Sequence, residues 1–336
     1  MLDLTKIWVT RLVAGSGTVG MMLLFGGVIY GGSLMFVFPF ERVGEFVEAT
    51  MSTMGYDVEV GAAKPMFGIG VKLEDVRVAN RPTDGKKSAH FVIDSARITT
   101  KPWKNLMGGL AYGIKAGAFG GDLAVAVEAN KDKGEGSASI NDINLAELPG
   151  IKESIGLPLA GTISAEVQML LPKLHAAEAD GRIEISCSDC SVGDGKAKLK
   201  VPSNPLLAEG LTMPKLRFGD LDGTIVFSKG NGQIEGLHSK SPDIELDVDG
   251  TIRLADPVEM SQVDLYIKFK LSEKLVKSND KFQLLLQFAE MQGKRNDGFF
   301  GFRLQGSARR LRDPQWMKDS PFPPKGQRRA PKPNGA

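Results

Sequence analysis

The two cysteines of this 336-residue chain, Cys187 and Cys190, come nearest to a chemical motif. A C-x-x-C pair suits a disulfide bond, half of a metal site, a redox-active thiol pair or two free thiols. Redox-active pairs usually lie at a helix N-terminus, whereas residues 183–186 alternate like a strand. A metal site needs two more ligands, and only His175 or His238 offers nitrogen. We favour a structural disulfide, whose short loop adds about 2 kcal/mol in the chain-entropy model.

Four carboxylates, Asp243, Glu245, Asp247 and Asp249, alternate along one stretch. Such a row suggests a calcium site or an acid–base pair. Strict alternation, however, puts the four on one face of a strand, which is usually a solvated face that discourages aggregation. No G-x-S-x-G, P-loop or H-E-x-x-H sequence supplies a nucleophile, base and orienting group together. We therefore predict a non-enzymatic protein with no catalytic residues, no metal site and no cofactor.

An uncharged stretch near the N-terminus predicts a membrane anchor. Residues 12–40 carry no charge, and a helix needs roughly 20 apolar residues to cross a bilayer. A cleaved signal peptide and a buried core helix are the two alternatives. The run is longer than the apolar region of a cleaved signal peptide and lacks a small-residue cleavage site. Because Lys6 and Arg11 precede the run, we predict residues 1–11 in the cytoplasm, 12–38 as the anchor, and the bulk of the chain beyond the membrane.

Two glycine patterns lie within this region. Residues 15–20 match G-x-G-x-x-G, but they lack the preceding strand and aqueous site that dinucleotide binding requires. Gly27 and Gly31 form G-x-x-x-G, which lets two membrane helices approach closely. They are therefore candidates for helix pairing.

Composition narrows the classes of partner. A net charge of +2 provides no broad field for nucleic acid, and 7% aromatic residues are too few for a base-stacking platform. We expect no nucleic-acid partner. The 42% hydrophobic residues permit a real core, and 40 glycines suit a chain with many turns between strands.

The elements after the anchor follow from hydrophobic periodicity. Helical spacing from Val43 to Met54 predicts a short amphipathic helix that caps the sheet or lies on the membrane; capping is favoured because its polar face is not basic. The period then changes to two, which predicts antiparallel strands. A further helix is expected between residues 280 and 291. The alternating runs are 56–60, 71–78, 91–98, 123–127, 183–186, 244–249, 265–271 and 300–304. Three Gly-Thr-Ile triplets are expected to open strands; they begin at Gly161, Gly223 and Gly250.

These patterns predict a mainly β fold. After the anchor and the short helix, residues 41–312 would form a periplasmic domain, built as a long curved antiparallel sheet with a β-groove or an open sandwich. Residues 313–336 are rich in proline and basic residues and are expected to be a disordered tail.

The order of short features between Leu157 and Leu271 resembles the type II secretion system protein N family in its long-domain bacterial form. The features are residues 156–163, the cysteine pair, residues 213–223 and residues 243–254. The resemblance also includes the N-terminal anchor, the helix after it and residues 68–71, but not the tail.

This resemblance implies an inner-membrane accessory of the machinery that exports folded proteins, with other type II secretion components as partners. It also implies a distant AsmA-like character, in which an anchor precedes a long curved sheet that in some proteins is thought to guide lipids. The expected function is thus a periplasmic scaffold. The alternative is a protein that guides membrane lipids along a hydrophobic groove.

Overall fold

The computed structural model describes residues 41–53, 56–66, 70–80, 90–148, 157–199, 210–277, 283, 286, 290, 292–308, 310–311 and 314–323. The predicted anchor, residues 12–38 with Gly27 and Gly31, lies outside the described residues, as does the stretch 1–11. Within the described ranges, no helix combines the length and apolarity needed to cross a membrane.

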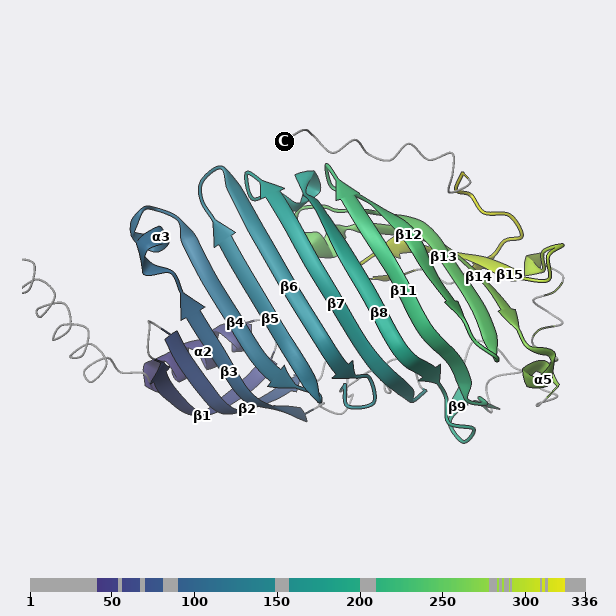
Figure 1. The fold of residues 1–336 in the computed structure, drawn as a ribbon, viewed down its shortest axis with the longest axis horizontal. Helices are drawn as coiled ribbons and strands as arrows, with labels where there is room; N and C mark the ends of the chain where they lie inside the picture. Colours follow the sequence, from purple (N-terminus) through teal and green to yellow (C-terminus); the bar gives the residue numbers. More distant parts are fainter. Residues whose placement is uncertain are drawn as a thin grey trace, which may run out of the picture.

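The chain folds mainly into one open antiparallel sheet of 15 strands (Figure 1). Most strands of this sheet pair with the next strand in sequence; the exceptions are that β8 pairs with β11 and that β17 pairs with β15. The predicted mainly β, antiparallel fold is confirmed. The strands are β1 (Tyr56–Met66), β2 (Gly70–Asn80), β3 (His90–Thr100), β4 (Leu110–Ala118), β5 (Gly121–Ala129), β6 (Lys133–Asn144), β7 (Leu159–Pro172), β8 (Asp180–Val192), β11 (Leu216–Ser228), β12 (Asn231–Lys240), β13 (Ile244–Arg253), β14 (Gln262–Leu271), β15 (Phe300–Ser307), β16 (Arg310–Leu311) and β17 (Gln315–Trp316). The short β9 (Lys198–Leu199) and β10 (Leu211–Thr212) pair separately.

The strand register places apolar side chains on one side of the whole sheet. Directly paired residues point to the same side, and Ile114 pairs with Val125, which pairs with Ala138. Bulges and left-handed residues such as Asp75 (φ 53°) interrupt the alternation along a strand, but apolar side chains lie on the same side of the sheet before and after them. We call this side the apolar face and the opposite side the outer face. The apolar face carries, among others, Val58, Leu73, Val76, Ile98, Ile114, Val125, Ala138, Val167, Ile183, Ile225, Ile234, Val248, Ile267 and Phe302.

Helix α2 (Glu41–Thr53) covers the apolar face at the N-terminal end of the sheet. Its Val47 and Met51 pack against a buried cluster that includes Leu73 and Val76. The predicted amphipathic helix is therefore present, and it caps the sheet. In Figure 1 the sheet is viewed from the side opposite α2, and it curves away from the viewer at both ends. The apolar face is consequently the concave one.

A second cover lies at the C-terminal end. Leu275 of α5 (Glu273–Val276), Leu286 and Phe300 are buried together with Leu157 and Met213. Leu286 has helical backbone, as do Gln283 and Glu290, in the stretch where the sequence predicts a helix. Segments far apart in the chain thus close this end.

The boundary predicted at residue 313 is wrong for residues 314–323. Strand β17 pairs with β15, and the Trp316 ring lies 5.9 Å from the Phe302 ring. The Tyr266 hydroxyl donates to the Lys318 carbonyl at 2.8 Å. Proline and basic residues suggested disorder, but aromatic packing and strand pairing hold this segment. Residues 324–336 lie outside the description.

The Gly-Thr-Ile triplets do not generally open strands. Gly161 is near the start of β7, but Gly223 lies inside β11 and Gly250 near the end of β13. The register shifts beside Gly161 and beside Gly223. Glycine is suited to such bulges because it lacks a Cβ, so two of the triplets mark irregularities within strands.

Candidate functional site

The most distinctive surface is the part of the apolar face between the two covers. Five large apolar side chains there, which we call the open stretch, come from adjacent strands β4 and β5. They are Leu110 (46% exposed), Tyr112 (45%), Ile114 (44%), Val125 (42%) and Val127 (39%). By contrast, Leu73 under α2 is 2% exposed. Exposed apolar patches of this kind mark ligand grooves, membrane contacts or protein interfaces.

Small residues form the floor next to the open stretch. Gly136 and Ala138 of β6 pair with Val127 and Val125, and Val167 and Met169 continue the apolar face on β7. A Cβ added at Gly136 would meet no atom within 4 Å. Space above β6 is therefore bounded by apolar groups on both sides.

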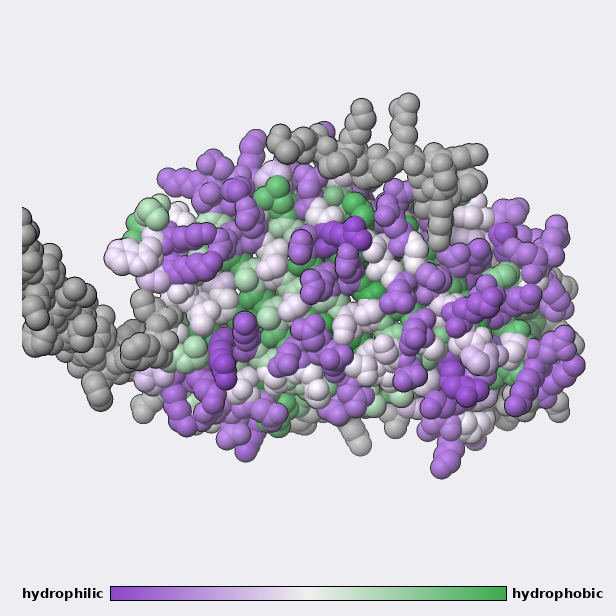
Figure 2. All heavy atoms as spheres, in the orientation of Figure 1, coloured by the Kyte–Doolittle hydropathy of each residue, from purple (hydrophilic) through white to green (hydrophobic). Residues whose placement is uncertain are grey.

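The outer face has a different character. Figure 2 shows it from the same direction as Figure 1: hydrophilic side chains dominate, with paler and hydrophobic residues among them over the central strands. Lys64 and Lys72 both bond Glu74, and Arg182 pairs with Glu184. The concave and convex sides thus differ sharply in polarity.

Two carboxylates on the outer face have strongly shifted pKa values. Hydrogen bonds from Lys64 and then Lys72 lower the pKa of Glu74 to about 2. Lys101 and then Lys104 lower the pKa of Glu128 to about 2 in the same way. Because cation pairing keeps both groups ionised at neutral pH, neither is suited to donate or accept a proton in a reaction there.

A hollow of about 700 Å³ lies across β3 to β7. It is lined largely by outer-face residues, including Arg97, Lys115, Ser137 and Gln168, and it includes Glu128. The lining also includes Tyr112, Ile114 and Val125, and its carboxylate Glu128 is already paired with lysines. These residues do not form a reactive constellation.

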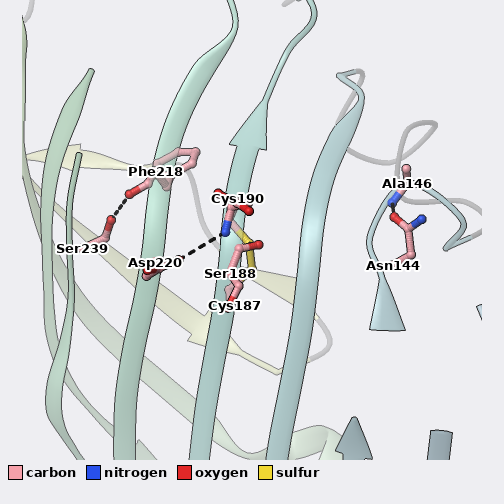
Figure 3. Close-up of a disulfide and its surroundings, with 9 residues drawn as sticks. Asn144, Ala146, Cys187, Ser188, Cys190, Phe218, Asp220 and Ser239 are labelled. Atoms are coloured by element: carbon pink, nitrogen blue, oxygen red, sulfur yellow. Dashed lines mark hydrogen bonds between the residues drawn. A yellow bond between two sulfur atoms is a disulfide. The ribbon is translucent and has the colours of Figure 1, made fainter. Parts of the chain in front are cut away.

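The structure joins Cys187 and Cys190 in a disulfide, with the two Cα atoms 5.9 Å apart. Both residues are buried within β8, and the register with the neighbouring strands shifts at this point. Figure 3 shows the bond lying along β8 beside β11. The intervening Asp189 has φ 52°, and its N–H donates to Asp220 Oδ1 on β11 at 3.3 Å. The bond therefore spans a bulge, within a single strand where the sequence suggested a strand followed by a turn.

Gly161 on β7 faces this bulge. Its φ is +117°, and a Cβ there would lie 2.8 Å from both the Cα and Sγ atoms of Cys190. Glycine at this position thus allows β7 to approach the disulfide. The pair has a structural setting, with no described metal ligand or helix N-terminus beside it.

The alternating carboxylates form cross-strand contacts. Asp243 accepts two hydrogen bonds from the Arg217 guanidinium, at 2.7 and 3.0 Å, and these hold its pKa below the ordinary value. Asp247 pairs with Lys268 at 3.1 Å, and Glu245 is opposite Lys270 on β14. The row therefore stabilises strand pairing on the outer face.

His175 lies next to a carboxylate and away from the cysteine pair. Its Nδ1 lies 3.3 Å from Asp256 Oδ2, on another segment. The backbone N–H of Ala176 donates to the same carboxylate at 2.8 Å and is the main cause of its lowered pKa. Among the described residues, no group of three or more His, Cys, Asp or Glu side chains could hold a metal.

Sequence reasoning missed the open stretch because it missed β4. The sequence Leu110-Ala111-Tyr112-Gly113-Ile114 alternates large and small residues, which is a signal for a strand, but its glycine and alanine weaken that signal because both have low strand propensity.

Comparison of this chain with models of protein families, with curated proteins and with solved structures finds no match.

Proposed function

We propose that the chain is a non-enzymatic envelope protein whose apolar face shields the acyl chain of a membrane lipid. One observation carries the proposal: the apolar face continues from β1 to β15, yet side chains of the open stretch remain about two-fifths exposed. Burying a Val, Ile or Leu side chain stabilises by roughly 1.5–3 kcal/mol. An acyl chain lying on this surface would recover part of that energy.

The shape of the site suits a flexible hydrocarbon better than a compact polar ligand. The surface crosses several strands, its floor consists of Gly136 and Ala138, and its sides are aliphatic. The predicted anchor at residues 12–38 would hold this surface beside the inner membrane, on the periplasmic side, where lipid is the abundant apolar ligand.

Lipid extraction from the purified full chain tests the proposal. The chain is isolated in mild detergent, and its lipids are quantified by mass spectrometry. Val125→Glu places a charge in the open stretch and is expected to reduce bound lipid severalfold. The matched control is Ala126→Glu, because Ala126 is the next residue, is exposed and points to the outer face. Equal retention by the two variants, or no lipid on the unmodified chain, would refute the proposal.

A scaffold in type II secretion is the second candidate, and a specific feature favours it. Strand β1 is an edge strand of 11 residues that pairs with β2 and with no other described strand. Edge strands can accept a strand from a partner. The N–H of Val60 donates to Glu48 Oε1 of α2 at 2.7 Å, so α2 protects part of this edge.

Deletion and complementation distinguish the two functions. The scaffold proposal expects that deletion impairs export of secreted enzymes and that the chain co-purifies with other secretion components. If deletion impairs export because the edge strand β1 is lost, complementation with Val125→Glu should restore export. If export depends on lipid binding by the open stretch, the same variant should fail to restore it. Unchanged export after deletion would exclude the scaffold role.

A further inference from the structure

The turn between β3 and β4 presents three large apolar side chains to solvent. It contains the short helix α3 (Pro102–Leu106), which has no buried residue. Trp103 is 76% exposed, Leu106 77% and Met107 81%. We call these three residues the α3 tip. Few surfaces of a soluble domain keep a Trp, a Leu and a Met together in water without a partner.

The α3 tip is held in place by specific hydrogen bonds. The Asn105 amide donates to Thr100 Oγ1 at 2.8 Å, and its oxygen accepts the Ala111 N–H at 2.9 Å. The Gly109 N–H donates to the Lys104 carbonyl at 2.9 Å, and Gly108 takes a left-handed φ of +80° to make the turn. The apolar side chains are thus displayed by an ordered turn.

Two lysines lie beside the tip. Lys101 and Lys104 both pair with Glu128, and their side chains are 67% and 51% exposed. Two ammonium groups and one carboxylate leave a net positive charge beside the apolar side chains. That charge is complementary to anionic lipid headgroups.

The tip is also continuous with the open stretch. Strand β4 begins directly after the turn, and Leu110, Tyr112 and Ile114 point to the apolar face in succession. All three are more than two-fifths exposed. An apolar path therefore leads from the α3 tip onto the concave side of the sheet.

We infer that the α3 tip inserts into the interfacial layer of an anionic membrane, at the point where an acyl chain passes between the bilayer and the apolar face. This inference rests on the proposed lipid-shielding function. Trp favours the bilayer interface, Leu and Met partition into the acyl region, and lysine attracts anionic headgroups. The predicted anchor supports a bilayer as occupant, since residue 38 is three positions before α2 begins. In Figure 1, α2 and α3 lie at the same end of the ribbon.

A site-specific fluorophore on the full chain tests this inference. The chain has two cysteines, and both are in the disulfide, so Met107→Cys introduces a single reactive thiol. The labelled chain is reconstituted in nanodiscs of anionic lipid. A label at position 107 should report an apolar environment and be quenched severalfold more by lipid-borne than by aqueous quenchers. Lys277→Cys, next to α5 at the opposite end of the ribbon (Figure 1), is the matched control because its side chain is 72% exposed, and it should show the reverse.

The outcomes separate this inference from the proposed function. A label at position 107 that remains in water would overturn the membrane contact, even if lipid co-purifies and Val125→Glu removes it. A lipid-embedded label on a chain that retains no lipid would refute only the shielding role. With zwitterionic lipid alone the signal should weaken; an unchanged signal would overturn the assigned role of Lys101 and Lys104.

Discussion

The N-terminal end and the middle of the apolar face have the same residue pattern but opposite environments. Under α2, Leu73 and Val76 are 2% and 5% exposed, whereas Ile114 and Val125 are 44% and 42% exposed on strands β4 and β5. All four are aliphatic and lie on the same side of one sheet. The comparison shows that alternation defines a face, and that a covering element decides whether the face becomes core or remains a surface for binding.

The largest expected difference concerns truncation at these two places. Leu73→Ala should lower the free energy of unfolding by about 2–5 kcal/mol because it opens a cavity under α2. Ile114→Ala should lower it by less than about 1 kcal/mol, because solvent already reaches this side chain. Urea unfolding of both variants in the same detergent measures the contrast. A similar loss for both would show that the open stretch is covered in solution.

A second test compares two glycines of the central strands. Gly161→Ala should destabilise by roughly 1–3 kcal/mol or more, since its φ of +117° is strained for alanine and the new Cβ meets Cys190. Gly136→Ala should be nearly neutral, because nothing lies within 4 Å of its Cβ position. Thermal unfolding monitored by circular dichroism provides both values. A large cost at Gly136 would mean that the space above β6 is already filled.

The C-terminal cover is expected to be weaker than the α2 cover. Trp316 is 40% exposed, and its ring contacts those of Phe302 and Phe269, at 5.9 and 6.5 Å. Trp316→Ala should therefore cost about 1–2 kcal/mol, given that aromatic pairs contribute about 0.5–1.5 kcal/mol each. Increased proteolysis after residue 313 should accompany the loss. An unchanged cleavage pattern would show that β17 does not help to hold this end.

The smallest effect concerns charge pairing on the outer face, next to the α3 tip. Folding lowers the pKa of Glu128 from 4.5 to about 2, because Lys101 and Lys104 bond its carboxylate. A lowered folded-state pKa gives stability that is fully present above about pH 4.5 and is lost as the pH falls toward 2. Glu128→Gln should thus reduce the melting temperature slightly at pH 7 and not at all near pH 2. A difference that grew on acidification would contradict the pairing.

Several features could be predicted from local sequence. The alternation at residues 244–249 and 265–271 predicted strands β13 and β14, and the spacing of Cys187 and Cys190 suggested a disulfide. Glycine-rich β4 and β6 were missed, because residues such as Gly113 and Gly136 have poor intrinsic strand propensity. They adopt strands because neighbours on both sides supply hydrogen bonds. Three of the five side chains of the open stretch lie on the missed strand β4, and its floor lies on the missed strand β6, which is why sequence alone did not reveal the site.

By itself, the sequence determined that the chain forms a sheet with one apolar and one polar side, because side chains alternate every two residues along any strand. Only the tertiary structure decided where that apolar side is core. Contacts between α2 and the first strands, and between Trp316, Leu286 and β15, join segments that no local pattern connects. The stretch between these covers remains exposed, since no described element reaches across β4 and β5 to bury it.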